Sequence, residues 1–400
     1  MNNTLGIITE YNPFHNGHLY NIEKGKTISK SENVIVAMSG NFVQRGQPAI
    51  IDKYKRCEMA LIGGADLCLE IPTPYVLESA ENFSKCGVSI FDKSNIVDNI
   101  VFGSESGNID SLSHIATFLL YENIEYKLAL KKNLDLGISY PKAVSTTLKS
   151  FGFNENFTAN NTLAIQYLIA LQEQSSKIKA YTVKREGSNY HDNTINDSTL
   201  GASATAIREI LHNSKNIELA KGYIPENIYE LFQKEVTQNF TSIDNLSDIF
   251  HYRLATMTIT ELQNINHVSE GIENLILNTS NKFYLISDIL EQCTSKRYTK
   301  SKISRIILSI ILDIKKDGTS KTCPPYIRVL GYKKEKEFLL KDLIKKSSLP
   351  VIVNLNKSFL PPEAKKMLED EKKYSKIYNL SFNSKKTSKF DEVQSKPIII

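Results

Sequence analysis

Two histidines near the start of the chain have the type and spacing for phosphoryl chemistry. His15 and His18 flank Gly17 directly after a short apolar stretch that ends at Thr9. At the start of a helix, both imidazoles can donate hydrogen bonds to the α-phosphate of a nucleotide while a nucleophile displaces pyrophosphate. The free backbone N–H groups there attract phosphate, and Gly17 lacks the Cβ that would hold it away. This HxGH pattern predicts an ATP-dependent adenylyl-transfer site; the alternative is two unrelated histidines in a turn.

A second element with phosphate-binding character follows about 190 residues later. Ser203 and Thr205 stand at the start of a predicted helix, and Arg208 follows one turn on. The hydroxyl groups can cap the helix and touch phosphate, and the guanidinium fork suits the β- and γ-phosphates. Simple helix capping is the alternative. Together with the HxGH pattern, this element predicts the second half of a nucleotidyltransferase site.

Apolar strands alternating with helices must position these residues. We expect an α/β fold with a Rossmann-like nucleotidyltransferase domain built on a parallel sheet, because continuous apolar strands between helices indicate a sheet covered on both faces. The expected strands span residues 5–9, 33–39, 66–71, 96–102 and 178–183, and the expected helices span 17–29, 53–62, 79–91, 162–172 and 203–211. Ligands of such sheets lie at the carboxyl ends of the strands, where His15 and His18 are placed.

The strand signal fades after about Asn216, and four hundred residues exceed one ordinary core. We therefore predict two domains, a catalytic domain over residues 1–215 and a mostly α-helical domain over residues 216–400. Isoleucines between Ile303 and Ile314 recur at helical spacing and mark one apolar helix face. The tail from Ser381 is polar and lysine-rich, so we expect it to be poorly ordered.

Charge is distributed unevenly along the chain. The net charge is +5, but residues 296–346 carry fifteen Lys and Arg against five Asp and Glu, and residues 1–295 carry a net charge of about −9. A basic segment of this kind can neutralise an RNA backbone. Tyr298, Tyr326 and Tyr332 lie within it and can stack on unpaired bases. The alternative is a solvated charged face with tyrosines in the core.

The remaining composition narrows the class of protein. The chain is 41% hydrophobic and 23% charged, without an apolar run of membrane-spanning length or a basic-then-apolar leader, so we expect a cytoplasmic protein without membrane contact. Its five cysteines form no CxxC pair and are expected to be reduced. Asp66 and Glu70 suggest a metal site, but Mg²⁺ normally accompanies ATP on few protein ligands. We therefore predict no metal ligand from the protein.

Long motifs extend these local patterns. The chain resembles the bacterial tRNA(Met) cytidine acetate ligases over most of its length, most densely before residue 210. The motifs that carry the resemblance are the run from Gly6 to His18, Met38-Ser-Gly-Asn-Phe-Val-Gln-Arg-Gly46, Gly64-Ala-Asp-Leu-Cys-Leu-Glu-Ile-Pro72, Val101-Phe-Gly-Ser-Glu105, Asn160-Asn-Thr-Leu-Ala-Ile-Gln-Tyr167, Arg185 with Tyr190-His-Asp, Ser203 to Arg208, and Tyr326-Ile-Arg-Val-Leu-Gly331.

The resemblance implies a two-step reaction. Acetate and ATP give acetyl-adenylate and pyrophosphate, and the acetyl group then passes to the 4-amino group of the wobble cytidine in elongator tRNA(Met). It implies that ATP is held by the segment from Ile7 to Tyr20 and by Gly103, an asparagine at 160 or 161, and Arg185. With the residues argued above, the expected ATP-binding set is Ile7, Ile8, Thr9, Glu10, Tyr11, Asn12, Pro13, Phe14, His15, Asn16, Gly17, His18, Leu19, Tyr20, Gly103, Asn161, Arg185, Ser203, Thr205 and Arg208.

Several of these residues have a plainer interpretation. Gly103 can be an ordinary turn glycine, Asn161 the cap of a helix, and Arg185 a solvated arginine. We expect Arg45, in the loop from Gly40 to Pro48, to contact the acyl-adenylate or the RNA. For the basic segment we expect tRNA contacts from Lys296, Arg297, Lys300, Arg305 and Arg328.

Two other functions share some of these features. A small-molecule adenylyltransferase of the cofactor-biosynthesis type has HxGH and a hydroxyl-rich helix start but needs no basic extension. A non-catalytic RNA-binding protein with a vestigial ATP site needs no intact histidine pair.

Overall fold

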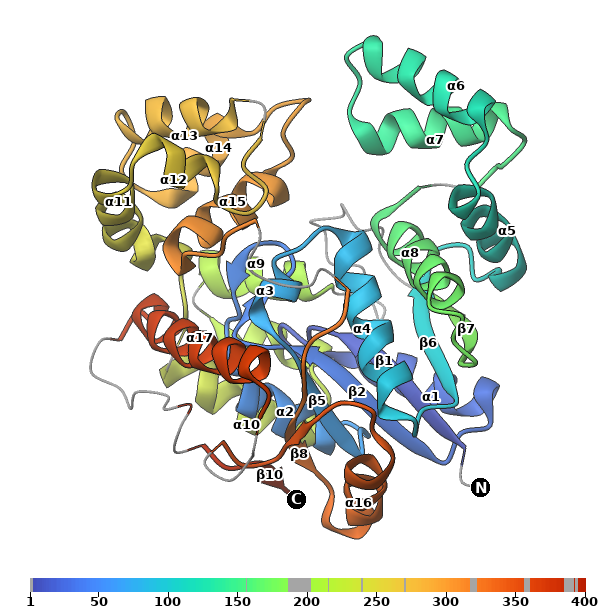
Figure 1. The fold of residues 1–400 in the computed structure, drawn as a ribbon. Helices are drawn as coiled ribbons and strands as arrows, with labels where there is room; N and C mark the ends of the chain where they lie inside the picture. The colour runs from blue at the N-terminus through green and yellow to red at the C-terminus, as the bar shows by residue number, and fades with distance from the viewer. Residues whose placement is uncertain are drawn as a thin grey trace.

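A twisted sheet with helices on both faces forms the centre of the protein (Figure 1). The computed structural model describes residues 3–155, 157–185, 203–214, 216–238, 240–269, 271–316, 322–355, 360–384, 392 and 395–400. The strands of the sheet run in the order β10-β8-β5-β2-β1-β6-β7, and β9 pairs with β8. Their bounds are β1 Thr4–Thr9, β2 Asn33–Ser39, β5 Leu67–Ile71, β6 Asn99–Ser104, β7 Lys179–Lys184, β8 Ile327–Tyr332, β9 Val351–Ile352 and β10 Ile398–Ile399.

The five strands from the first half of the chain are parallel, whereas β8 pairs antiparallel with β5. A hairpin of β3 (Phe42–Val43) and β4 (Gln47–Pro48) follows β2. The helices are α1 Asn16–Ser29, α2 Lys53–Ile62, α3 Thr73–Val76, α4 Ala80–Ser94, α5 Ile109–Leu120, α6 Ile124–Asp135, α7 Tyr140–Ser150, α8 Ala159–Glu173, α9 Ala204–Ser214, α10 Glu226–Gln238, α11 Ser247–Thr256, α12 Ile259–Gln263, α13 Ile272–Ser280, α14 Ile286–Cys293, α15 Lys300–Leu312, α16 Glu337–Lys346 and α17 Pro362–Tyr378.

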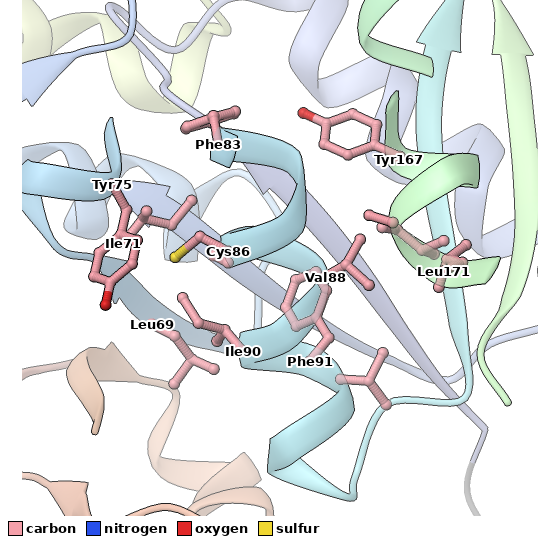
Figure 2. Packing of buried hydrophobic residues seen from close by; sticks show 14 of the residues in the cluster. Leu69, Ile71, Tyr75, Phe83, Cys86, Val88, Ile90, Phe91, Tyr167 and Leu171 are labelled. Atoms are coloured by element: carbon pink, nitrogen blue, oxygen red, sulfur yellow. The ribbon is translucent and has the colours of Figure 1, made fainter. Parts of the chain in front are cut away.

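Each face of the sheet has its own core. Alternate residues of β2 point to opposite faces, so Ile35 and Ala37 pack with α4, α5 and α8 while Val34 and Val36 pack with α1, α2, α9 and α10. Figure 2 shows Leu69 and Ile71 of β5 against Cys86 and Ile90 of α4, with α8 beyond. Strands buried on both faces require largely apolar sequences, and β2 and β5 have them, with the buried Glu70 of β5 as the charged exception.

A separate group of helices, α11 to α15, stands beside the carboxyl end of the sheet (Figure 1). We call residues 243–316 the helical lobe. Its core consists largely of isoleucine and leucine from α13, α14 and α15, and it also contains Phe42 and Leu77 of the sheet domain and Tyr378 of α17. The lobe is therefore packed directly against the elements that follow β2 and β5.

The predicted α/β class is confirmed, and the predicted strands and helices of the first half correspond to elements of the structure, α2 residue for residue. The predicted division at residue 215 does not follow the sheet. Strand β8 comes from the second half and pairs with β5 of the first, β10 extends the sheet by pairing with β8, and α10 packs on α2. The expectation of a poorly ordered tail is also wrong at its end, because Ile398 and Ile399 pair with Gly331 and Tyr332. No helix in the described part of the chain is long and apolar enough to cross a membrane.

Candidate active site

A cavity opens at the carboxyl ends of β1, β6 and β7, where the sequence predicts the nucleotide. Many of the expected ATP-binding residues line it, namely Ile7, Ile8, Thr9, Tyr11, His15, Gly17, His18, Tyr20, Gly103, Arg185 and Ser203. The lining also includes residues that the sequence did not single out, namely Asn21, Val101, Phe102, Asn160, Leu163, Tyr167, Val183 and Lys184. Asn160 was the alternative to Asn161. The others are ordinary strand and helix residues, and only the fold determines which of them point into the cavity.

The two histidines form the N-terminal cap of α1. The Nδ1 atom of His15 accepts a hydrogen bond from the Gly17 N–H at 3.0 Å, and Nδ1 of His18 accepts one from the His15 N–H at 3.2 Å. Since each Nδ1 is an acceptor, the proton of each neutral ring is on Nε2. Both imidazoles are thus fixed as Nε2–H donors, with ring centroids 3.7 Å apart.

Both rings are neutral at physiological pH. Burial lowers the pKa of His15 to about 3, helped by the positive charges of Arg185 and Arg208. Burial also lowers the pKa of His18 well below its usual range, with a further contribution from His15. Neutral donors of fixed orientation stabilise charge that develops on a phosphate without first releasing a proton.

Gly17 is required for a reason that differs from the one expected. A Cβ at this position would lie 2.9 Å from Cε1 of His15, so any side chain would displace the imidazole. The residue therefore makes room for the histidine ring, besides leaving the helix start open to a ligand.

Asn160 rather than Asn161 faces the cavity. Asn161 is buried, and its Oδ1 accepts hydrogen bonds from the backbone N–H groups of Glu105 and Ser106 at 2.9 and 3.3 Å. Asn160 lines the cavity, donates to Oε1 of Glu105 at 2.6 Å and accepts from Nη1 of Arg185 at 3.1 Å. Asn161 thus holds the loop after β6, and Asn160 is the asparagine whose side chain lines the cavity.

Arg208 joins α9 to the segment that carries the histidines. Its Nη1 donates to the carbonyl oxygen of Asn12 at 2.6 Å and its Nη2 to Oγ1 of Thr205 at 3.1 Å. Burial lowers its pKa to about 10, so the side chain still carries its charge at neutral pH. Ser203 lines the cavity and accepts from the Ala206 N–H at 3.2 Å, so it caps the helix. The flanking Gly201 lies outside the described residues.

The other residues of the expected nucleotide segment support the site from outside the cavity lining. Asn12 accepts from the Ile50 N–H at 2.9 Å, and the peptide bond between Asn12 and Pro13 is cis. Phe14 is fully buried against Gly63, and Asn16 donates to the carbonyl oxygen of Gly222 at 3.0 Å. Glu10 and Leu19 likewise do not belong to the lining.

Residues 40–48, which we call the rim loop, form the neighbouring edge of the site. The buried Arg56 fixes its base by donating to the carbonyl oxygens of Glu10, Ser39 and Gly40. Oε1 of Glu10 accepts from the Gln44 N–H at 2.6 Å. Arg45 is the next residue. Burial lowers the pKa of Arg45, and the carboxylate of Glu10 opposes this shift. The positive charge of Arg45 contributes in turn to the lowered pKa of Arg208. These effects place Arg45 near the phosphate-binding side.

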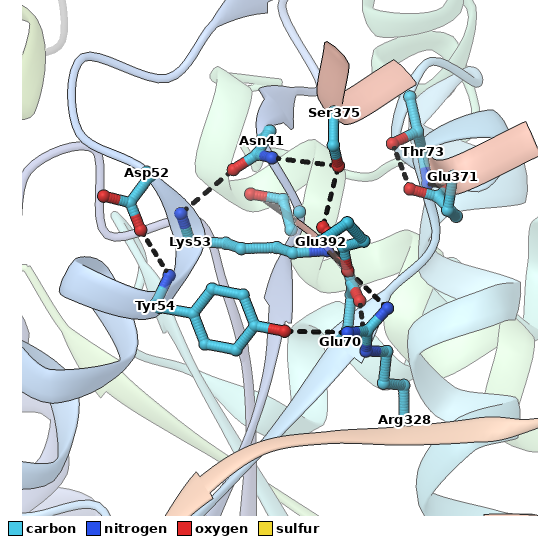
Figure 3. A network of polar contacts seen from close by, with 12 residues as sticks. Asn41, Asp52, Lys53, Tyr54, Glu70, Thr73, Arg328, Glu371, Ser375 and Glu392 are labelled. Carbon is cyan, nitrogen blue, oxygen red and sulfur yellow. Dashed lines mark hydrogen bonds and ion pairs between the residues drawn. The ribbon is translucent and has the colours of Figure 1, made fainter. Parts of the chain in front are cut away.

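A buried ionic network lies beneath the rim loop (Figure 3). Nζ of Lys53 contacts Glu70 at 2.5 Å and Glu392 at 2.8 Å, and Arg328 pairs with Glu392 and donates to Tyr54. The expectation that Arg328 binds tRNA is wrong, because this side chain is 3% exposed and its charge is satisfied inside the protein. Tyr326, at 1% exposure, is likewise excluded as a base-stacking surface.

The basic segment 296–346 is divided between two ends of the molecule. Lys296, Arg297 and Lys300 are exposed at the start of α15, on the lobe beside the rim loop. The lysines around α16 lie at the amino ends of the strands instead, where Lys336 donates to Oδ1 of Asn33 at 2.8 Å. Arg305, also expected on the tRNA surface, points inward and donates to the carbonyl oxygen of Gln44 at 3.3 Å.

Comparison with known proteins agrees with this geometry. The family model described as HIGH Nucleotidyl Transferase matches residues 1–393, and the chain belongs to this family. Within it, the chain is 38% identical to the tRNA(Met) cytidine acetate ligase of Caldanaerobacter subterraneus over 97% of both chains, and 41% identical to that of Clostridium novyi over 89% of this chain and 91% of the relative. A crystal structure of Thermotoga maritima TmcAL bound with alpha-thio ATP superposes with a TM-score of 0.88 at 29% identity, covering 100% of this chain and 99% of the other.

Proposed function

We propose that the chain ligates acetate to the wobble cytidine of elongator tRNA(Met), forming N4-acetylcytidine at the expense of ATP. The observation that carries this proposal is the pair of neutral imidazoles held as Nε2–H donors at a helix start, at the carboxyl edge of the sheet and close to Arg185 and Arg208. The names of the relatives supply the acceptor and the acyl group.

In the first step, a carboxylate oxygen of acetate attacks the α-phosphorus of ATP. The bond between the α-phosphorus and the bridging oxygen breaks, and pyrophosphate leaves. His15 and His18 donate to the α-phosphate oxygens, where charge builds up. Arg208, with Ser203 and Thr205 beside it, neutralises the phosphates that depart, and Arg185 and Asn160 hold the nucleotide from the side of β7 and α8.

In the second step, the 4-amino group of the cytidine attacks the acetyl carbonyl carbon. The bond to the phosphate oxygen of AMP breaks, and the amine loses one proton. No covalent enzyme intermediate is needed, so catalysis rests on positioning and electrostatics. Arg45 is suited to stabilise the departing AMP phosphate, since it stands near Arg208.

Exposed cations of the helical lobe supply the tRNA surface. Lys296, Arg297 and Lys300 continue outward from the rim loop, and phosphate contacts by such residues give affinity without sequence choice. Mg²⁺ would enter with ATP, bound mainly through the phosphates. The proposed tRNA substrate would place the reaction in the cytoplasm.

The test measures pyrophosphate release from ATP with and without acetate, followed by mass spectrometry of nucleosides from tRNA(Met). Acetate-dependent release and acetylcytidine in the tRNA support the proposal, and a His18→Ala variant that loses both is the control. Release that needs a different co-substrate indicates a small-molecule adenylyltransferase. Absence of release indicates a vestigial nucleotide site.

A further inference from the structure

The contact between α15 and the rim loop is built from buried and half-buried polar groups. Oγ of Ser304 donates to the carbonyl oxygen of Gly46 at 2.6 Å, and Nη1 of Arg305 donates to that of Gln44 at 3.3 Å. Gly46 has a φ of +80°, and a Cβ there would lie 2.5 Å from the backbone N of Arg305. The loop and the helix are thus in direct backbone contact, and even a methyl group would separate them.

A second set of contacts holds the same junction from the side of α3 and α4. Oε1 of Glu78 accepts from Asn266 at 2.8 Å, and Nε2 of His267 lies 2.9 Å from the carbonyl oxygen of Leu77. Burial lowers the pKa of Arg305 to about 10, and the carboxylate of Glu78 opposes that shift. Nε of Arg305 is buried and has no hydrogen-bond partner among the described residues. The guanidinium of the half-buried Arg305 is thus directed at the rim loop and partly shielded from solvent.

Gln44 connects the junction to the catalytic segment. Its backbone N–H donates to Glu10, its carbonyl oxygen accepts from Arg305, and its Nε2 donates to the carbonyl oxygen of Glu78 at 3.2 Å. Arg45 is the next residue. A displacement of α15 therefore moves Gln44 and Arg45, whereas the histidine cap depends on its own hydrogen bonds and the backbone of Glu10 depends on Arg56.

We propose that Ser304 and Arg305 are positioning residues, which set the rim loop for acetyl transfer to RNA but are dispensable for forming the adenylate. The inference rests on the proposed function. The helical lobe would then do more than bind tRNA. Helix α15, which begins with the exposed Lys300, would also hold the rim loop beside the phosphates of the bound nucleotide. A shift of α15 on tRNA docking would reach Arg45 through the contact of Arg305 with Gln44, the residue that precedes Arg45.

The test compares two identical substitutions on one helix. Ser304→Ala removes the hydrogen bond to Gly46, whereas Ser309→Ala, the matched control, removes a buried hydroxyl that has no hydrogen-bond partner in the part of the chain that the structure describes. Arg305→Met and Gly46→Ala perturb the junction more strongly. For each variant, acetate-dependent exchange of pyrophosphate into ATP reports adenylate formation, and single-turnover acetylation of tRNA(Met) reports transfer.

We expect exchange within about twofold of the parent for all four variants, and transfer at saturating tRNA slowed about tenfold by Ser304→Ala and more by Arg305→Met and Gly46→Ala. The KM for tRNA and its salt dependence should stay at the parent values. Lys300→Met should show the opposite pattern, with a raised KM and a shallower salt dependence.

Three results would overturn the inference. Ser304→Ala could match Ser309→Ala in transfer, or Arg305→Met could raise the KM for tRNA without lowering the saturated rate, which would make it a phosphate contact. Loss of exchange and transfer together would show a general structural role and overturn it as well. Failure of the proposed function is distinct, since the parent would then acetylate no tRNA at all.

Discussion

Replacing Glu392 by glutamine tests whether the buried network beneath the rim loop depends on its charge balance. Glu392 and Glu70 are the two carboxylates that pair with the buried Lys53 and Arg328. Removing one negative charge leaves two enclosed cations facing a single carboxylate. Breaking a buried pair in this way costs about 3–5 kcal/mol. For a chain of 400 residues, with roughly 0.8 kcal/mol/K of unfolding entropy, the melting temperature should fall by about 4–6 °C.

Glu371→Gln is the matched control, because Glu371 is equally buried and accepts hydrogen bonds from the N–H and hydroxyl of Thr73 at 2.6 and 2.9 Å. Burial, with Glu70 nearby, raises the pKa of Glu371 to about 8. Its unfolded pKa is near 4.5, so the parent loses stability as pH rises from about 4.5 through 8, whereas the glutamine variant does not. Glu371→Gln should therefore be neutral or stabilising at pH 7, increasingly so toward pH 8.

Scanning fluorimetry of both variants between pH 5 and 8 gives the comparison. Burial alone would raise the pKa of Glu392, but the charges of Lys53 and Arg328 outweigh it and lower the pKa. The contribution of Glu392 to the stability of the fold is therefore present above its unfolded pKa and is lost only on acidification. Equal losses of melting temperature for the two variants at pH 7, or a larger loss for Glu371→Gln, would refute this account of the network.

Further outcomes follow from the active site. Replacing His15 or His18 by alanine should slow acetate-dependent pyrophosphate exchange about 100- to 1000-fold with little change in ATP affinity, as measured by equilibrium binding. Because burial lowers the pKa of His15 to about 3, the exchange rate should show no loss attributable to imidazole protonation between pH 5.5 and 8, which a pH profile of the parent checks. Asn160→Ala should raise the KM for ATP, whereas Asn161→Ala should mainly lower the melting temperature, because its amide holds two backbone N–H groups. The reverse assignment of these effects would return the ATP contact to Asn161.

The sequence predicted the centre of the sheet well for a physical reason. Strands β1, β2 and β5 are buried on both faces, and continuous apolar runs bounded by Gly and Pro are visible without knowledge of their neighbours. The histidine pair was equally visible, because its spacing and glycine are local. Its tautomers and neutral charge depend on burial and on hydrogen bonds that only the folded chain defines.

The second half was predicted less well because its features are non-local. β8 contains Arg328 within an otherwise apolar run, and the partners that make this arginine a core residue are 258 and 64 positions away in the sequence, at Glu70 and Glu392. Counted as charge, Arg328 looked like part of an RNA surface. The sequence alone also does not show which of Asn160 and Asn161 faces the cavity, since adjacent helix positions differ by about 100° in direction and α8 begins three residues before its predicted start.

The pairing of β8 with β5 has a consequence for synthesis of the chain. Leu67–Ile71 is a fully buried strand that is apolar except for Glu70, yet the strand that covers its edge begins at Ile327. At ribosomal rates of roughly 5–20 residues per second, this edge waits on the order of 10 to 50 seconds for its partner. During that interval the nascent chain exposes an unpaired apolar strand, the kind of edge that other chains can extend. The growing polypeptide therefore has its greatest need of chaperones between the emergence of β5 and that of β8.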